Sequence, residues 1–192
     1  VGHSLGGAIA LRTAELCPDC VVGVTCLNAG GGIYIEDEFS RFRALGRYMV
    51  QLRHPWLRRL PLLDWMFWKA GTEQPLPRHW RRQRLEDFVI ADAQAALGSL
   101  LESTTEEEVH HLPQVVARLR QPVYFMGGDK DSIMQPCYVR HLASFHALFM
   151  ACAGGSNLVE IPDCGHLAML EQTDWVAAKL REIVASHALA SA

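Results

Sequence analysis

Short apolar runs alternating with helical stretches constrain the fold of this chain more than any other feature. Three runs are rich in β-branched or aromatic residues and end at Gly, Asn or Pro, as buried strands do: Val21–Leu27, Pro122–Met126 and Leu158–Ile161. Three other stretches have helical periodicity: Leu5–Leu16, Tyr138–Met150 and Trp175–Val184. Strands that alternate with helices build a parallel sheet covered on both faces. The sequence therefore predicts an α/β fold.

The composition agrees with a folded domain. Of the 192 residues, 49% are apolar and 20% are charged, which excludes a disordered tail, a collagen-like chain and a disulfide-rich miniprotein. The formal net charge of −3 gives no general attraction to nucleic acid. No apolar run approaches the roughly 20 residues that span a bilayer. No signal peptide is visible, and we expect a cytoplasmic location.

The region between the first two apolar runs is predicted to be almost wholly helical from about Glu36 to Arg120. Four prolines divide it into short helices: Pro55, Pro61, Pro75 and Pro77. We expect three segments: a core segment over 1–30, a helical insertion over 31–115, and a second core segment over 116–192.

Charge is unevenly distributed in this insertion. Residues 41–84 contain ten Arg and one Lys against two acids, and also four of the five Trp. Residues 85–116 contain seven acids and no Lys or Arg. Two interpretations remain open: the basic block contacts an anionic membrane surface, or it pairs with the acidic block inside the insertion.

Six Cys are present, and Cys17-Pro18-Asp19-Cys20 forms a CxxC. A zinc site needs a further pair of ligands at suitable spacing, and none is visible. The motif falls at the carboxyl end of a predicted helix, where the helix dipole opposes a thiolate. We therefore interpret these Cys as structural, and we expect neither a metal nor a cofactor.

The first residues contain the motif that carries chemistry. Gly2-His3-Ser4-Leu5-Gly6 matches G-x-S-x-G and directly precedes a helical pattern, as a tight strand-to-helix turn requires. Such a turn exposes the Ser4 hydroxyl, and the Leu5 N–H faces a developing oxyanion. We expect Gly2 and Gly6 to lack side chains because Cβ atoms would clash across the turn. His3 is expected to point elsewhere.

A serine hydroxyl needs a base, and the base needs a carboxylate. Of the nine His, His166 follows a predicted strand and a Gly, whereas seven others lie on or beside predicted helices. The carboxylate comes from Gly128-Asp129-Lys130-Asp131, which follows another strand. We choose Asp131, with Asp129 as the alternative, because Asp129 is better placed to bind turn amides.

These three motifs, in the order Ser, acid, His, resemble the α/β-hydrolase superfamily. The resemblance extends over essentially the whole chain, from the nucleophile turn to the last helix. It implies a parallel-sheet α/β-hydrolase fold, a helical cap at about 31–112 and a Ser4-His166-Asp131 triad. Family members have several strands before the nucleophile turn. We therefore expect a fold incomplete at its N-terminus and a fragment that is inactive by itself.

The resemblance implies a serine hydrolase that cleaves a carboxylic ester or related acyl bond of an apolar small molecule. Carbon–carbon bond hydrolysis and cofactor-free haloperoxidase chemistry use the same triad and remain open. Two other classes are a non-catalytic binding protein with this fold and an inactive truncated product. The Trp, Phe, Met and Leu content of the insertion suggests an apolar pocket, and packing of the insertion on the core is the alternative.

Overall fold

The computed structural model describes residues 1–60, 63–146, 152 and 155–188. The chain forms two compact units, which we call the core unit and the helical unit. The core unit comprises Val1–Gly32, Gly71–Gln74 and Leu112–Ala192. The helical unit comprises Ile33–Ala70 and Pro75–His111.

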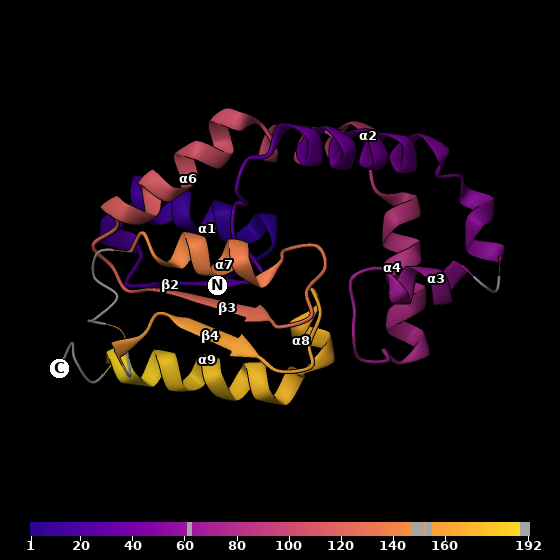
Figure 1. Ribbon diagram of the computed structural model, residues 1–192. Coiled ribbons are helices and arrows are strands. Elements are labelled where there is room, and N and C mark those ends of the chain that lie inside the picture. Colours follow the sequence, from indigo (N-terminus) through magenta and orange to yellow (C-terminus); the bar gives the residue numbers. More distant parts are fainter. Residues whose placement is uncertain (61–62, 147–151, 153–154, 189–192) are drawn as a thin grey trace. The chain divides into compact units, whose positions relative to one another are not determined.

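The core unit contains a parallel sheet in the order β1-β2-β3-β4 (Figure 1). Its strands are β1 (Gly2–His3), β2 (Val24–Leu27), β3 (Val123–Gly128) and β4 (Leu158–Ile161). Because all four strands run the same way, their carboxyl ends lie at one edge of the sheet. The predicted parallel α/β sheet is confirmed.

Three strands differ from their predicted bounds, and the strand predicted over Pro122–Met126 is β3, Val123–Gly128. Gly2 and His3 pair with Cys26 and Leu27, although the sequence predicts no strand before the first helix. Two residues are too few to show an alternating pattern. Residues 21–23 precede β2, and Val22 is 90% exposed, because pairing with the next strand begins only at Val24.

Helices cover both faces of the sheet. On one face, α1, α6 and α7 pack on β2 and β3, and on the other face α8 and α9 pack on β2, β3 and β4. The bounds are α1 (Leu5–Leu16), α6 (Glu106–Arg118), α7 (Pro136–Ala143), α8 (Ala168–Glu171) and α9 (Thr173–Ala188). The side chains of β3 alternate between the faces: Val123 and Phe125 meet the first, Tyr124 and Met126 the second. This double coverage explains why β2 and β3 are continuously apolar.

Two of the predicted helices have revised ends. The helix predicted for 138–150 is α7, which ends at Ala143, and residues 147–150 lie outside the described part. The closing helix is predicted over Trp175–Val184, and α9 extends beyond this range at both ends. The first helix begins and ends where the sequence predicts.

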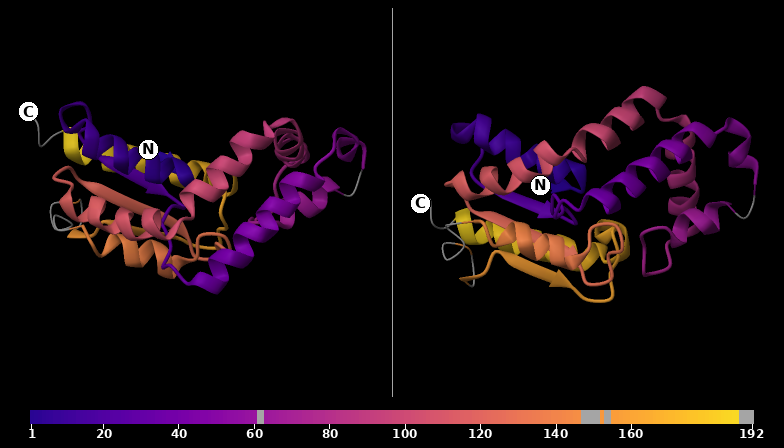
Figure 2. Two further views of the ribbon diagram at one scale, coloured as in Figure 1. Left: turned by 90° about the horizontal axis from the view of Figure 1, so that it is seen from above. Right: turned by 45° about the horizontal axis from the view of Figure 1, so that its top comes forward.

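The helical unit is built from successive helices without an intervening strand among its described residues (purple to magenta in Figure 2). They are α2 (Glu36–Leu52), the 3₁₀ helix η2 (Pro55–Arg59), α3 (Leu63–Lys69), α4 (Arg78–Ile90) and α5 (Ala93–Ser103), followed by the first turns of α6. Pro55 opens η2 and Pro77 precedes α4, consistent with the helix-breaking role predicted for proline. Asp92 caps α5 by accepting a hydrogen bond from the Ala95 N–H at 2.8 Å.

The unit boundaries differ from the predicted segments at one important place. Gly71–Gln74, predicted to belong to the insertion, belongs to the core unit. The Gly71 carbonyl accepts a hydrogen bond from the His166 N–H at 2.7 Å, and a carboxylate from α8 binds the amides of Glu73 and Gln74. Sequence periodicity cannot reveal this because such bonds join segments far apart in the chain.

None of the described helices is both long enough and apolar enough to cross a membrane.

Candidate active site

The turn from β1 to α1 places Ser4 in a strained backbone conformation. Ser4 has φ 51° and ψ −123°, and a positive φ is uncommon for any residue but glycine. The Ser4 N–H donates to the carbonyl of Leu27 at 2.9 Å, and the Ser4 carbonyl accepts from the Gly7 N–H at 2.9 Å. These bonds hold a conformation that costs of the order of 1–3 kcal/mol. The hydroxyl therefore stands at the start of a helix, at the carboxyl end of the sheet.

Gly2 and Gly7, rather than Gly2 and Gly6, make this turn possible. A Cβ atom on Gly2 would lie 2.0 Å from the Gly6 carbonyl oxygen, and one on Gly7 would lie 2.4 Å from Cβ of Ala29. A Cβ atom on Gly6 would meet nothing within 4 Å outside its own helix backbone. The prediction for Gly6 is therefore wrong, because its missing Cβ points away from the turn.

The structure brings Ser4, His166 and Asp131 into one hydrogen-bonded chain. His166 Nδ1 lies 2.8 Å from Asp131 Oδ2, and His166 Nε2 lies 3.1 Å from Ser4 Oγ. A carboxylate only accepts, so Nδ1 carries the proton and Nε2 is free to accept from the Ser4 hydroxyl. This tautomer can take a proton from Ser4, and the carboxylate can stabilise the imidazolium that results.

Asp131 is buried and fully bonded. Its Oδ2 accepts from His166 and from the Asn28 side-chain amide at 2.9 Å, while its Oδ1 accepts from the N–H groups of Ile133 and Met134 at 2.9 and 2.8 Å. Burial alone raises the pKa of Asp131, but the hydrogen bond and charge of His166, with the bonds from Asn28 and Met134, outweigh it. The pKa is therefore lowered, and the carboxylate stays ionised.

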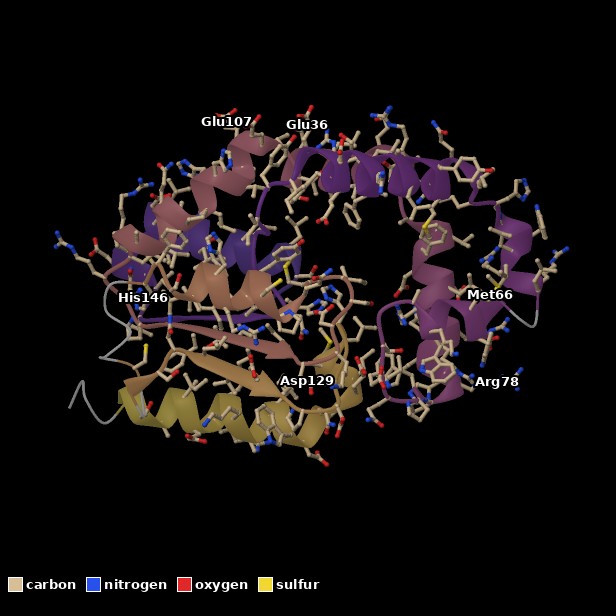
Figure 3. The ribbon with its side chains drawn as sticks, in the orientation of Figure 1. Glu36, Met66, Arg78, Glu107, Asp129 and His146 are labelled. Atoms are coloured by element: carbon tan, nitrogen blue, oxygen red, sulfur yellow. The ribbon has the colours of Figure 1, made fainter. Side chains whose placement is uncertain are left out.

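Asp129, the alternative acid, lies elsewhere in the same turn, beyond the end of β3 (Figure 3). Its Oδ1 accepts from the Cys164 N–H at 3.3 Å, and its Oδ2 is 3.2 Å from Lys130 Nζ. It thus binds an amide, as the sequence argument proposed. His146, also labelled in Figure 3, lies at the other end of β3, where it accepts from the Val123 N–H.

Asn28 is a site residue that no sequence motif indicated. It follows β2, has no exposed surface and has φ 48°. Its Nδ2 donates to Asp131 Oδ2 at 2.9 Å and to the Gly165 carbonyl at 3.0 Å. It therefore joins the acid to the loop that carries His166. The available signal was its position, since Asn tolerates a positive φ and polar residues after parallel strands often reach a site.

His3 lies against His166, so the prediction that it points elsewhere is wrong. Its Nε2 donates to the His166 carbonyl at 2.8 Å, and the two ring centroids are 4.8 Å apart. Burial lowers the pKa of His3, and the charge of His166 lowers it further, against the opposing effects of the carbonyl bond and Asp131. A neutral His3 can donate to this carbonyl without adding a second positive charge beside His166.

Leu5, the predicted oxyanion donor, is the first residue of α1. The first N–H groups of a helix have no partner within that helix and lie at the positive end of its dipole. The Leu5 N–H follows Ser4 directly, and backbone donors in such a position can stabilise an oxyanion.

The remaining polar candidates do not join this site. Cys17 and Cys20 are exposed free thiols at the end of α1 and in the 3₁₀ turn Pro18–Cys20. Burial and nearby carboxylates raise the pKa of the Cys164 thiol to about 12, which keeps it neutral. Among the residues that the structure describes, His, Cys, Asp and Glu form no group that could hold a metal ion.

The α/β-hydrolase class is defined by a strained serine between a strand and a helix that is hydrogen-bonded to a histidine, which in turn is hydrogen-bonded to an aspartate, both from later strand ends. The chain belongs to the Alpha/beta hydrolase family, whose model matches residues 1–179. The predicted family is thereby confirmed.

The chain is also similar to individual proteins. It is 25% identical over 194 aligned positions to the dihydrolipoyllysine-residue acetyltransferase component of the acetoin cleaving system of Pseudomonas putida. Among solved structures, it resembles an esterase from Thermogutta terrifontis (16% identity, TM-score 0.65). It also resembles the enol-lactonase of Burkholderia xenovorans LB400 (20%, 0.66) and a 2-hydroxy-6-oxo-6-phenylhexa-2,4-dienoate hydrolase from Rhodococcus (20%, 0.66). At identities this low, the similarity to the solved structures shows a shared fold alone.

Each match extends over almost all of this chain but only part of the other protein. The alignments cover 97% of the chain and 45% of the Pseudomonas protein. For the three structures they cover 97%, 96% and 95% of the chain, and 64%, 64% and 62% of the other protein, in the order named.

Proposed function

We propose that the protein is a serine hydrolase that cleaves a carboxylic ester, or a related acyl bond, of an apolar small molecule. The observation that carries the proposal is the chain of hydrogen bonds from Ser4 through His166 to Asp131. The strained backbone at Ser4 supports it, because strain of this kind concentrates at functional sites. A protein that only bound ligands would have no need for this tautomer and spacing.

In the first step, Ser4 Oγ attacks the acyl carbon while His166 Nε2 accepts the hydroxyl proton. The carbonyl oxygen becomes an oxyanion that accepts a hydrogen bond from the Leu5 N–H. The tetrahedral intermediate then collapses, and the bond to the leaving alcohol breaks. His166 returns the proton to the alcohol oxygen, which leaves an acyl group on Ser4.

In the second step, water attacks the acyl-enzyme. His166 accepts a proton from the water, a second tetrahedral intermediate forms, and its collapse releases the carboxylic acid. The proton returns to Ser4 Oγ. Asp131 keeps its negative charge throughout and stabilises the imidazolium in both steps.

Exposed apolar side chains support an apolar substrate. Leu5 adjoins Ser4 and is 37% exposed, and Ile133, whose N–H binds Asp131, is 45% exposed. In the helical unit, α2 has no buried residue, and several of its apolar side chains are exposed: Phe42, Leu45, Met49 and Leu52. We propose that the helical unit is the cap that selects the substrate.

The basic block of the helical unit supports a peripheral contact with an anionic membrane. A groove of about 420 Å³ between η2 and α4 is lined by Arg58, Arg59 and Arg82, with Trp56 and Glu86. Arg58 lies 3.5 Å from Glu86, so the basic and acidic blocks do pair at this point. Within the described part of the chain, no carboxylate pairs with Arg59 or Arg82, which leaves two charges for phosphate headgroups.

We also propose a cytoplasmic location and that these 192 residues, expressed by themselves, are inactive. Apolar side chains next to the edge strand β1 support the second point, since Val1 precedes β1, Ile9 lies on the following helix α1, and they are 76% and 58% exposed. An uncovered apolar edge favours aggregation. A soluble monomer of these residues with clear esterase activity would contradict the proposal.

A fluorophosphonate probe applied to the full-length protein tests the proposed function. We expect covalent labelling at Ser4 and hydrolysis of a short apolar ester, with both lost in Ser4→Ala. Ser156→Ala is the matched control, because Ser156 is an exposed serine that hydrogen-bonds only near its own turn. Failure of a folded wild-type protein to react would instead favour a binding protein with this fold.

A further inference from the structure

The carboxylate of Glu171 accepts hydrogen bonds from four backbone N–H groups close to His166 in the fold. Glu171, the last residue of α8, accepts through Oε2 from Glu73, Gln74 and Gly165 at 2.7, 2.9 and 3.0 Å. Its Oε1 accepts from Leu167 at 3.1 Å. Two of these donors flank His166 directly, and the other two belong to Gly71–Gln74, which we call the strap.

The strap also binds the backbone of His166 itself. The Gly71 carbonyl accepts from the His166 N–H at 2.7 Å, while the His166 carbonyl accepts from His3 at 2.8 Å. The Gly165 carbonyl accepts from Asn28. Both backbone groups of Gly165 and of His166 are therefore held by partners from outside their own loop.

The strap lies so close to the His166 loop that no side chain fits between them. A Cβ atom on Gly165 would lie 2.8 Å from the Glu73 nitrogen, 2.8 Å from Cα of Thr72 and 2.9 Å from the Gly71 oxygen. Contacts under 3.0 Å with backbone atoms require the backbone to move. Glycine at 165 is therefore a requirement of this packing.

We propose that Glu171 is a positioning residue, which clamps the strap to the loop of His166 and thereby holds the imidazole within reach of Ser4. The proposal rests on the proposed function, since it assigns Glu171 a role through the base. The physical reason is preorganisation, because a reacting group displaced by about 1 Å can lose about 10²-fold in rate. The strap separates two stretches of the helical unit in sequence, but it belongs to the core unit, as His166 does.

The rate constant of fluorophosphonate labelling at Ser4, measured separately from the fraction finally labelled, tests the clamp in the full-length protein. We expect Glu171→Ala to label about 10²-fold more slowly than the wild type, to the same final extent. Glu171→Gln keeps one oxygen that can accept up to three of the four bonds, so its rate should lie between the two. In ester hydrolysis the variants should lower kcat and leave KM nearly unchanged.

Two further variants separate positioning from folding. Gly165→Ala displaces the strap without altering the carboxylate, and we expect it to slow labelling as well. Gln172→Ala is the control, because Gln172 adjoins Glu171 and its side-chain amide donates to the Pro162 carbonyl at 3.4 Å rather than to the strap. It should label at the wild-type rate.

The outcomes distinguish the two proposals. A lower labelled fraction with an unchanged rate constant in Glu171→Ala and Glu171→Gln would mean a purely structural role and would overturn the clamp alone. If Glu171→Ala does not fold, Glu171→Gln and Gly165→Ala decide the question by the same rate criterion. A folded wild-type protein that does not react at Ser4 would overturn the proposed function and the clamp together.

Discussion

Two side-chain hydrogen bonds at the site of the core unit join residues 103 and 163 positions apart, namely Asn28 with Asp131 and His3 with His166. In the described residues of the helical unit, corresponding bonds join nearer residues. Arg43 binds Thr104, 61 positions away, and Arg84 binds the Ala70 carbonyl, 14 positions away. The parallel sheet brings distant strand ends together, whereas the helices form from neighbouring residues and then pack. Precise geometry is therefore concentrated in the core unit.

Burial differs in the same way. The core unit has apolar layers on both faces of its sheet, and Phe125 and Met126 have no exposed surface. In the helical unit, α2 buries no residue, and α5 buries none either. Because burial of apolar area is the main favourable term in folding, we expect most of the stability to reside in the core unit. Four experiments test this contrast.

The largest effect should follow a change in the acid of the site. We expect Asp131→Asn to lower kcat about 10⁴-fold, because the amide no longer holds His166 in the tautomer that accepts from Ser4. Ester hydrolysis by the full-length protein measures it. Asp129→Asn is the matched control and should stay close to the wild type. A larger loss in Asp129→Asn than in Asp131→Asn would show that Asp129, and not Asp131, is the acid.

The next largest effect should distinguish the two units by stability. Phe125→Ala empties a fully buried site in the core unit and should cost about 3–5 kcal/mol of unfolding free energy. Leu45→Ala, on α2 and 60% exposed, should change it by less than about 0.5 kcal/mol. Urea unfolding of the full-length protein measures both. A cost of several kcal/mol for Leu45→Ala would show that this face of α2 is covered, which would remove the contrast.

A smaller effect is expected when two arginines of the groove in the helical unit are replaced, and it concerns binding to anionic vesicles. Each basic side chain near an anionic bilayer contributes about 1 kcal/mol, so Arg59→Gln with Arg82→Gln should weaken vesicle binding about 30-fold. Sedimentation with phosphatidylserine vesicles measures it, with phosphatidylcholine vesicles as the neutral reference. Arg118→Gln with Arg140→Gln removes the same charge from the core unit and should leave binding unchanged. Equal losses in both double variants would reduce the proposal to a net-charge effect.

The smallest effect concerns acid stability of the core unit. Because burial lowers the pKa of His3 below its ordinary value of 6.5, the unfolded chain takes up this proton before the folded one. Unfolding free energy should fall as pH drops through 6.5, by at most about 1.4 kcal/mol per pH unit for this group. His3→Gln should reduce the loss between pH 8 and pH 5.5. An unchanged pH dependence would mean that His3 does not contribute.

Periodicity and motifs predicted a large part of the fold and of the candidate site. The bounds of α1 and β4, the parallel sheet and the family are confirmed. Ser4 could be selected by its motif, and Asp131 and His166 because each follows a predicted strand and the carboxyl ends of parallel strands share one edge. Asp131 bonds to His166 and Asp129 binds an amide, which agrees with the reason for choosing between them.

The surroundings of these residues could not be predicted in the same way. Asn28 had no motif, His3 was assigned away from the site, and the strap was assigned to the insertion. Each depends on a bond between segments whose separation in sequence contains no periodic signal. The role of Gly6 was misjudged for a related reason, since the direction of a missing Cβ depends on the backbone angles of the turn.

By itself, the sequence determined which segments form strands and helices and which side chains could supply a nucleophile, a base and an acid. These properties follow from side-chain type and local period. The tertiary structure decided which groups bind the loop of His166, namely Asn28, Glu171 and the strap, and which turn glycines are required. Those features arise from strand register and from close approach of backbones, which become defined only when distant segments pack.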